Sequence, residues 1–194
     1  MLVVVCGPPG TGKTTVASRI ADRAGGTLLR TDTVRKELVA QPSYTDRETE
    51  RTYDALYDRA RDRVANGEDV VLDGTFRRQR YRDRARELSA DRDAAFELVR
   101  VTCPSPVVRE RIAARDGDAS DADFDVHLTV RDSFEPLERD HRRVDNGGSL
   151  ARTRRQVDEF LRDEGLVDGA DGGETSVDGG DDPDADVEGS GPPA

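Results

Sequence analysis

One short glycine-rich segment, residues 7–14 with the sequence GPPGTGKT, limits the folds open to this chain more than any other part of it. The apolar run LVVVC precedes it at residues 2–6, and a helical pattern follows at residues 13–23. This order of strand, loop and helix has the GxxxxGK[ST] spacing of a phosphate-binding loop, or P-loop. Glycines let the backbone curl so that successive N–H groups point into one concavity that a phosphate can fill. The segment therefore predicts an α/β fold that binds a nucleoside triphosphate.

The residues of the loop have separate expected roles. The N-terminus of the following helix would offer unpaired N–H groups and the positive end of its dipole to phosphate. Lys13 would contact the β- and γ-phosphates, and the Thr14 hydroxyl would bind Mg²⁺. We therefore predict ATP and Mg²⁺ as cofactors. The predicted nucleotide-binding residues of the loop are Gly7, Gly10, Thr11, Gly12, Lys13, Thr14 and Thr15.

Short apolar runs alternate with helical patterns along most of the chain. Such alternation is typical of a parallel sheet with helices on both faces, in which ligands bind at the carboxyl ends of the strands. The expected strands are residues 2–6, 27–31, 69–72, 96–102 and 143–145. The expected helices are residues 13–23, 34–39, 46–66, 77–88, 105–115 and 121–134, and a last amphipathic helix capped by Ser149.

Charge divides the chain into two parts. The 194 residues carry a net charge of −11, but eleven of the 41 acidic residues and none of the 30 basic residues lie beyond Arg162. The segment after Arg162 is mostly Gly, Asp, Pro and Ser, which cannot bury enough apolar surface to offset the entropy lost on ordering. We therefore predict a P-loop domain at residues 1–162 and a disordered acidic tail at residues 163–194.

The cysteines and the apolar runs indicate a cytoplasmic protein. Cys6 and Cys103 stand at the ends of expected buried strands without metal-ligand spacing, so we expect both to be reduced core residues. The apolar run at the start is too short for a signal peptide, and no run approaches the length of a membrane span.

Polar residues follow the second and third expected strands. Asp32 could accept or orient the proton of an attacking hydroxyl, or it could only cap the short helix that follows. One turn later, Arg35 could hold an acceptor anion. Asp73 could bind Mg²⁺ through water as a Walker-B-like aspartate, or form a structural Asp-Gly turn. Arg77 could line the acceptor site or lie on a solvated helix face.

Arginines before residues 116–120 (DGDAS) are candidates for a lid that closes over the nucleotide. Phosphoryl transfer gathers negative charge on the moving group, and a lid arginine stabilises that charge. Arg115 is our lid candidate, although in so arginine-rich a chain it could equally be a solvated surface group. His127 and His141 have no spacing that indicates a metal site or a catalytic triad, and we assign them no role.

Several of these features together resemble the P-loop kinases of small molecules and polynucleotides. They are the loop at residues 7–15, Asp32 with Arg35, LDGTF at residues 72–76 and the arginines between residues 109 and 115. The group includes zeta-toxin-like kinases, gluconate and shikimate kinases, chloramphenicol phosphotransferase and polynucleotide 5′-hydroxyl kinases. The resemblance covers residues 1–162 and implies a five-stranded parallel sheet in the order 2-3-1-4-5. It also implies Asp32 as general base, Arg111 near adenine, Arg115 as lid arginine and the loop at residues 144–148 near the base.

Our interpretation is an ATP-dependent kinase that transfers the γ-phosphate to a hydroxyl of a small molecule or a nucleic-acid end. A GTPase would carry an NKxD segment, which is absent, and a AAA+ or helicase motor would carry an acidic pair where Gly74 follows Asp73. The alternative is a nucleotide-binding regulatory or interaction protein with little or no turnover. The predicted catalytic residues are Lys13, Asp32 and Arg115, the predicted substrate-binding residues Asp32, Arg35 and Arg77, and the predicted metal ligands Thr14 and Asp73.

Overall fold

The computed structural model of the chain describes residues 1–115 and 121–167, and the side chains of all of these except residues 115 and 121–123. The predicted tail thus lies almost entirely outside the described residues. The elements in chain order are β1 (Leu2–Cys6), α1 (Lys13–Ala24), β2 (Thr27–Arg30), α2 (Thr31–Leu38), α3 (Asp46–Ala65), β3 (Val70–Asp73), α4 (Gln79–Ala90), β4 (Phe96–Thr102), α5 (Ser105–Arg115), α6 (Asp121–Asp132), β5 (Arg142–Asp145) and α7 (Leu150–Asp163).

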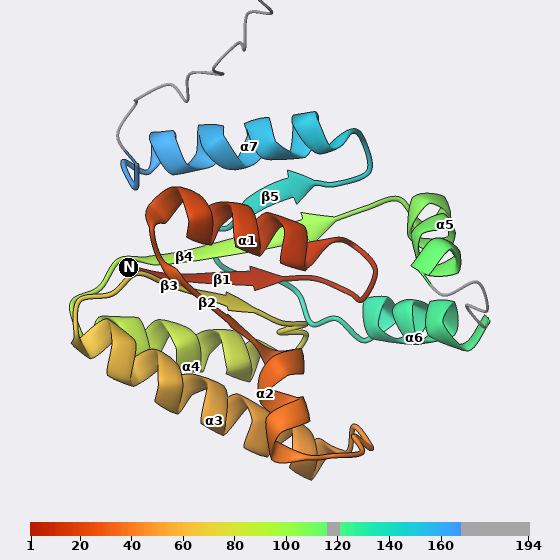
Figure 1. Cartoon of the computed structure of the whole chain (residues 1–194), viewed down its shortest axis with the longest axis horizontal. Coiled ribbons are helices and arrows are strands. Elements are labelled where there is room, and N and C mark those ends of the chain that lie inside the picture. Colours follow the sequence, from red (N-terminus) through yellow and green to blue (C-terminus); the bar gives the residue numbers. More distant parts are fainter. Residues whose placement is uncertain (116–120, 168–194) are drawn as a thin grey trace, which may run out of the picture.

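Five parallel strands form one sheet in the order β2-β3-β1-β4-β5, which confirms the predicted topology. The register pairs Val5 of β1 with Asp73 of β3, and Arg30 of β2 with the same Asp73. The arrowheads of the strands in Figure 1 accordingly point to one common edge of the sheet, where α5 and α6 lie. The P-loop leaves β1 at this carboxyl edge, so the predicted site residues after β1, β2 and β3 are brought to one place.

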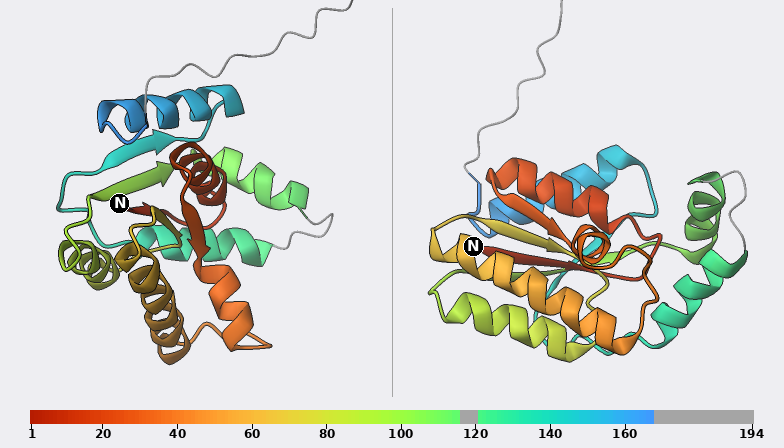
Figure 2. Two further views of the ribbon diagram at one scale, coloured as in Figure 1. Left: turned by 60° about the vertical axis from the view of Figure 1, so that its left-hand side comes forward. Right: turned by 60° about the horizontal axis from the view of Figure 1, so that its bottom comes forward.

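Helices cover both faces of the sheet (Figures 1 and 2). Successive side chains of a strand point to opposite faces, so Val3 and Val5 pack with α1 and α7, whereas Leu2 and Val4 pack with α3 and α4. All five residues of β1 are fully buried, as expected of a central parallel strand. The sheet edge beyond β1 is therefore fixed between two packed layers, which gives the P-loop a rigid base.

Side chains and glycine fix the ends of several helices. Thr45 caps α3, because its hydroxyl accepts a hydrogen bond from the Glu48 N–H group at 3.2 Å. Gly67, with φ of 78°, closes the other end of α3 by donating its N–H to the Val64 carbonyl at 3.0 Å. The predicted cap of α7 is present, since Ser149 accepts from the Arg152 N–H group.

Two element boundaries differ from the prediction where the site begins. The second strand was expected to reach residue 31, but β2 ends at Arg30 and α2 starts at Thr31. The Thr31 hydroxyl donates to the Asp73 carbonyl at 3.3 Å, a contact made by the first residue of the helix. Asp32 consequently lies in the first turn of α2 and not at a strand end.

The fourth helix starts at Gln79, two residues later than expected. Phe76 has φ of 46°, its ring packs edge-on against Tyr53, and its N–H group donates to the Tyr53 hydroxyl at 2.9 Å. Because Tyr53 fixes Phe76 in this left-handed conformation, the backbone turns before α4 can begin.

The described fold continues beyond residue 162. Leu166 and Val167 pack against the hydrophobic cluster between α1, α7 and the sheet, and the Leu166 N–H group donates to the Leu161 carbonyl at 2.9 Å. Within residues 1–115 and 121–167, no helix has the length and apolar character required to cross a membrane.

Candidate active site

The P-loop between β1 and α1 is shaped by close contacts that only glycine permits. Gly12 is the N-cap of α1 with φ of 84°, and a Cβ atom on it would lie 2.0 Å from the Asn146 amide nitrogen. A Cβ on Gly10 would lie 2.6 Å from Val108. No side chain of the described residues caps α1, so its first N–H groups stay available for an anion.

Lys13 is folded back across the loop. Its ammonium group donates to the Pro8 carbonyl at 3.0 Å, and the buried Thr11 hydroxyl donates to the same carbonyl at 2.9 Å. Burial lowers the pKa of Lys13, while the nearby carboxylates of Asp73 and Asp32 act in the opposite direction. The ammonium group is therefore held at the loop with two carboxylates close to it.

Thr14 and Asp73, predicted as metal ligands, are in contact. The Thr14 hydroxyl donates to Asp73 Oδ2 at 2.7 Å, and Asp73 is only 5% exposed at the end of β3. A hydroxyl and a carboxylate oxygen are ligands that Mg²⁺ takes, together with substrate phosphates and water. No group of three or more His, Cys, Asp or Glu side chains gathers into a metal cluster among the described residues. The donor set thus fits Mg²⁺ bound with a nucleotide, and it does not fit a metal held by protein side chains alone.

Arg30, the last residue of β2, reaches the same pair. Its Nε lies 3.4 Å from Asp73 Oδ2, and its Nη2 lies 3.4 Å from the Thr14 hydroxyl. The sequence pattern assigns Arg30 no role. No spacing rule could have marked it, because its two partners lie 16 and 43 residues away along the chain.

Asp32 is exposed to solvent at the carboxyl edge. The N-cap of α2 is Arg30, and no side-chain hydrogen bond caps that helix. Asp32 also makes no hydrogen bond or ion pair with any described side chain, so the alternative of a helix-capping aspartate has no support in the geometry. Burial lowers the pKa of Lys13, and the charge of Asp32, like that of Asp73, acts against this lowering.

The predicted acceptor-binding arginines are partly engaged within the protein. Arg35 is 7% exposed and pairs with Glu48 of α3, and its Nη2 donates to the Thr49 hydroxyl at 3.4 Å. Arg77 is half-buried and donates to the Ser133 hydroxyl at 3.1 Å. Their roles in acceptor binding remain predictions.

The two arginines assigned to the nucleotide and the lid stand on α5. Arg111 Nη1 would be 3.7 Å from a Cβ on Gly12, so Arg111 lies beside the P-loop, and it also contacts the Cys103 sulfur at 3.6 Å. Arg115 is the last residue of α5, and its side chain lies outside the described residues.

Two further residues hold the P-loop and were given no role from the sequence. His127 of α6 is 2% exposed, and its Nδ1 lies 2.7 Å from the Pro9 carbonyl, to which it donates. Asn146 donates its amide to the Thr11 carbonyl at 2.9 Å and accepts from the Thr153 hydroxyl of α7 at 2.7 Å. For Asn146 the only signal was the resemblance, which placed residues 144–148 near the base.

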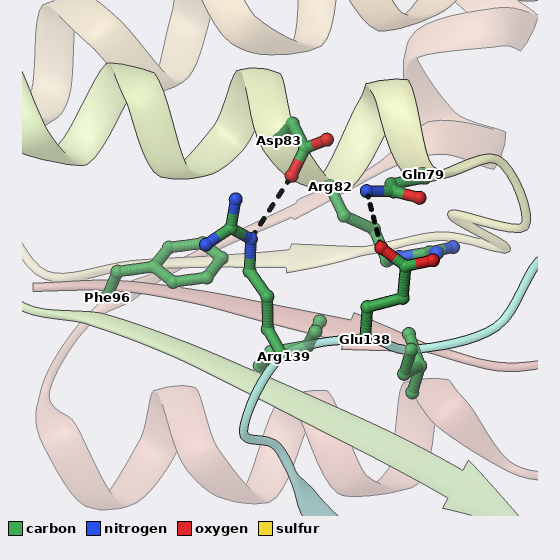
Figure 3. A pocket seen from close by; sticks show the side chains of 8 residues that line it. Gln79, Arg82, Asp83, Phe96, Glu138 and Arg139 are labelled. Carbon is green, nitrogen blue, oxygen red and sulfur yellow. Dashed lines mark hydrogen bonds and ion pairs between the residues drawn. The ribbon is translucent and has the colours of Figure 1, made fainter.

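A separate small hollow lies between α4 and the segment before β5 (Figure 3). Arg139 donates to Asp83 at 3.4 Å there, and Gln79 lies 3.5 Å from Glu138. Because Phe96 at the start of β4 also lines it, this hollow extends toward the amino ends of the strands, away from the P-loop. A second groove lies between α1, the helix that follows the P-loop, and α7. Thr15, near the start of α1, lines this groove and is exposed.

The sheet order, the P-loop and the Thr14–Asp73 pair define a P-loop protein with a kinase-like fold. Similar solved structures include a gluconokinase from Sinorhizobium meliloti 1021, with a TM-score of 0.63 and 22% identity over 85% of this chain and 95% of that one. Another is the Mycobacterium tuberculosis APS kinase CysC in complex with AMPPNP and APS, with a TM-score of 0.65 and 18% identity over 83% and 96%. At these identities the likeness shows the fold alone.

A family model described as AAA domain matches residues 2–137, and the chain belongs to this family. Among curated proteins, the uncharacterized protein Rv2004c of Mycobacterium tuberculosis H37Rv is 30% identical over 164 residues. The uncharacterized protein Mb2027c of Mycobacterium bovis matches to the same extent. In each case the match covers 78% of this chain and 33% of the relative, so the chain spans about a third of the length of these relatives.

Proposed function

We propose that the protein is an ATP-dependent kinase that transfers the γ-phosphate to a hydroxyl group of a small molecule or of a nucleic-acid end. The observation that carries the proposal is the exposed carboxylate of Asp32 in the first turn of α2, two residues after Arg30, whose side chain contacts Thr14 and Asp73. A kinase needs a carboxylate that can reach both an entering hydroxyl and the γ-phosphate. Asp32 is exposed and therefore accessible to an acceptor, and it lies at the same edge of the sheet as the P-loop with the lysine that would hold that phosphate.

We assign a residue to each step of the transfer. The N–H groups of the P-loop and Lys13 bind the phosphates, which requires the Lys13 ammonium group to leave the Pro8 carbonyl. Thr14 and Asp73 would hold Mg²⁺, which supplies positive charge to the β- and γ-phosphate oxygens. The acceptor oxygen forms a bond to the γ-phosphorus, the bond from that phosphorus to the bridging oxygen of ADP breaks, and Asp32 takes the hydroxyl proton.

The fold neighbours favour a small-molecule acceptor over a motor function. Solved structures of this fold include proteins named as a gluconokinase, a sugar kinase and an APS kinase. Gly74 follows Asp73, so the second acidic residue that a motor would place after β3 is missing. We take a hydroxyl on a small, polar metabolite as the first acceptor class, and a 5′-hydroxyl nucleic-acid end as the second.

The test is phosphate transfer from γ-labelled ATP with Mg²⁺, at low and at high KCl. The acceptors are sugars, sugar acids, nucleosides and aminoglycosides, beside RNA and DNA oligonucleotides with 5′-hydroxyl ends. We expect label on one acceptor class with the natural chain and no label with Lys13→Ala. ATP binding without transfer to any acceptor would overturn the proposal in favour of a nucleotide-binding interaction protein.

A further inference from the structure

The Arg30 side chain contacts both residues that we assign to Mg²⁺. The Arg30 guanidinium spans Asp73 Oδ2 and the Thr14 hydroxyl, each at 3.4 Å, while these two groups are themselves joined at 2.7 Å. One side chain therefore contacts both protein groups that would hold the metal.

Asp73 requires a cation nearby. Its side chain is 6% exposed, and a buried carboxylate without a compensating charge is strongly unfavourable. Lys13 contributes at longer range, but its ammonium group is hydrogen-bonded to the Pro8 carbonyl. The direct ion pair of Asp73 is with Arg30.

The contact of Arg30 with Asp73 is weak enough for another cation to replace Arg30. A separation of 3.4 Å is long for a charged hydrogen bond, and the Arg30 side chain is 39% exposed. The enclosed pair of Arg35 with Glu48, in contrast, has side chains only 9% and 7% exposed. Arg30 can move into solvent, or toward bound phosphate, without leaving a buried charge of its own.

We propose that Arg30 is a built-in substitute for the metal: it neutralises Asp73 in the free protein and is displaced when Mg²⁺ arrives with the nucleotide. This inference rests on the assignment of Thr14 and Asp73 to Mg²⁺ in the proposed function. Mg²⁺ alone must compete with a tethered guanidinium and therefore binds weakly. With a nucleotide, phosphate oxygens complete the metal's ligands and accept the displaced guanidinium, so the site fills only when both are present.

The test measures metal binding to the full chain without nucleotide, using Mn²⁺ as the probe and electron paramagnetic resonance to count free metal. We expect Arg30→Gln to tighten Mn²⁺ binding by about 3- to 10-fold, the effect of removing a partly exposed competing charge. We also expect Mn²⁺ and Mg²⁺ to raise the unfolding temperature of Arg30→Gln more than that of the natural chain. Equal Mn²⁺ affinity and equal thermal response in the two proteins would overturn the inference.

Three further variants make the result specific. Arg30→Lys keeps a cation but cannot contact Asp73 and Thr14 through two separate nitrogens, so its Mn²⁺ affinity should lie between those of the natural chain and Arg30→Gln. Arg30→Lys also serves as the test if Arg30→Gln does not fold. Adding Asp73→Asn to Arg30→Gln should remove the gain. Arg19→Gln is the matched control, since Arg19 is 33% exposed and pairs at 2.7 Å with Asp158 of α7, not with either residue assigned to the metal.

Failure of the two proposals can be told apart. Tighter Mn²⁺ binding in Arg30→Gln together with no phosphate transfer to any acceptor would uphold the metal substitute and overturn the kinase. Phosphate transfer with unchanged Mn²⁺ binding would do the reverse.

Discussion

Glu48 shows how one side chain connects α2, α3 and the loop between them. Its carboxylate pairs with Arg35 of α2 and accepts from the Ser43 N–H group and hydroxyl at 2.8 and 2.9 Å. The Ser43 N–H bond contributes most, and with Arg35 it lowers the pKa of Glu48 to about 2, although burial raises it. If Arg35 binds an acceptor anion, we expect it to do so while paired with Glu48, because separating the two side chains would leave each charge without its partner.

Acid should weaken the fold through Glu48. Because the pKa of Glu48 is lowered from 4.5 to about 2 in the folded chain, its contribution to the free energy of unfolding is present above pH 4.5 and is lost as pH falls toward 2. Unfolding temperatures measured across this range should fall more steeply for the natural chain than for Glu48→Gln. Glu37→Gln, which removes an exposed pair with Arg59 at 2.5 Å, should keep the natural slope. If Glu48→Gln and the natural chain had the same slope, the Glu48 network would not contribute to stability.

Replacement of Asp32 should separate catalysis from binding. Asp32→Asn keeps the size and the exposed position but cannot accept the hydroxyl proton. We expect kcat to fall by roughly 10²-fold or more with ATP affinity unchanged, as measured by steady-state kinetics and calorimetry. Asp58→Asn changes an aspartate on the exposed face of α3 and should leave both values as they are. Parallel loss of ATP binding in Asp32→Asn would indicate a structural role.

The helix pair α5–α6 touches the P-loop at two points. Val108 and Ile112 of α5 lie against Gly10, and His127 of α6 donates to the Pro9 carbonyl at 2.7 Å. The His127 ring also stacks on Phe124, with ring centroids 5.6 Å apart. The loop that would hold the phosphates and the helices that would carry the lid are therefore mechanically connected before any ligand binds.

His127→Phe keeps the stacked ring and removes the hydrogen bond. The Pro9 carbonyl then loses a buried partner, which costs about 1–3 kcal/mol. We expect a lower unfolding temperature and weaker ATP binding, measured by calorimetry. His141→Phe is the matched control, because His141 Nδ1 contacts a carbonyl at a similar distance, 2.8 Å, but on the exposed surface. If the unfolding temperature and ATP affinity of His127→Phe equalled those of the natural chain, the apolar contacts alone would hold α6 against the loop.

Local signals account for what could be predicted about the elements. The apolar run of β1, the glycine pattern of the P-loop and the Ser149 cap all lie within a few residues of the structure they specify. The ends of β2 and of the segment before α4 depend instead on Thr31 contacting Asp73 and Phe76 contacting Tyr53, which are 42 and 23 residues apart. Such partners are known only once the sheet order is known.

The site residues also divide into those that the sequence could predict and those that it could not. The P-loop residues and the meeting of Thr14 with Asp73 could be predicted, because a motif and the common edge of a parallel sheet bring them together. Arg30 and His127 could not, since the chain has 30 basic residues without a pattern that singles out Arg30, and the carbonyl partner of His127 is 118 residues away.

At the scale of the whole molecule, an ion pair and an apolar layer connect α1 with α7, the first and last described helices. Arg19 of α1 donates to both carboxylate oxygens of Asp158 of α7, at 3.0 and 2.7 Å, and Leu166 extends the apolar layer between them. The predicted boundary at residue 162 would cut into this layer, because Leu166 lies beyond it.

Two truncated chains test where the folded unit ends. A chain that stops after Val167 should keep the unfolding temperature and ATP affinity of the natural chain, because it keeps Leu166 and Val167 in the apolar layer. A chain that stops after Arg162 loses these contacts, and a loss of about 1 kcal/mol would lower the unfolding temperature by about 2–4 °C. Equal unfolding temperatures for the two truncated chains would place the boundary at residue 162 as predicted from the sequence.

The hydrogen bond from Asn146 to the Thr11 carbonyl has a consequence for the order of events on the ribosome. Translation delivers the P-loop before Asn146, which follows Thr11 by 135 residues, and the Thr153 hydroxyl that orients the Asn146 amide comes later still. A nascent chain that has exposed only β1 and α1 lacks this support and the β4 and β5 strands on that side of the sheet. We therefore expect nucleotide capture to begin only after α7 has left the exit tunnel and docked on α1.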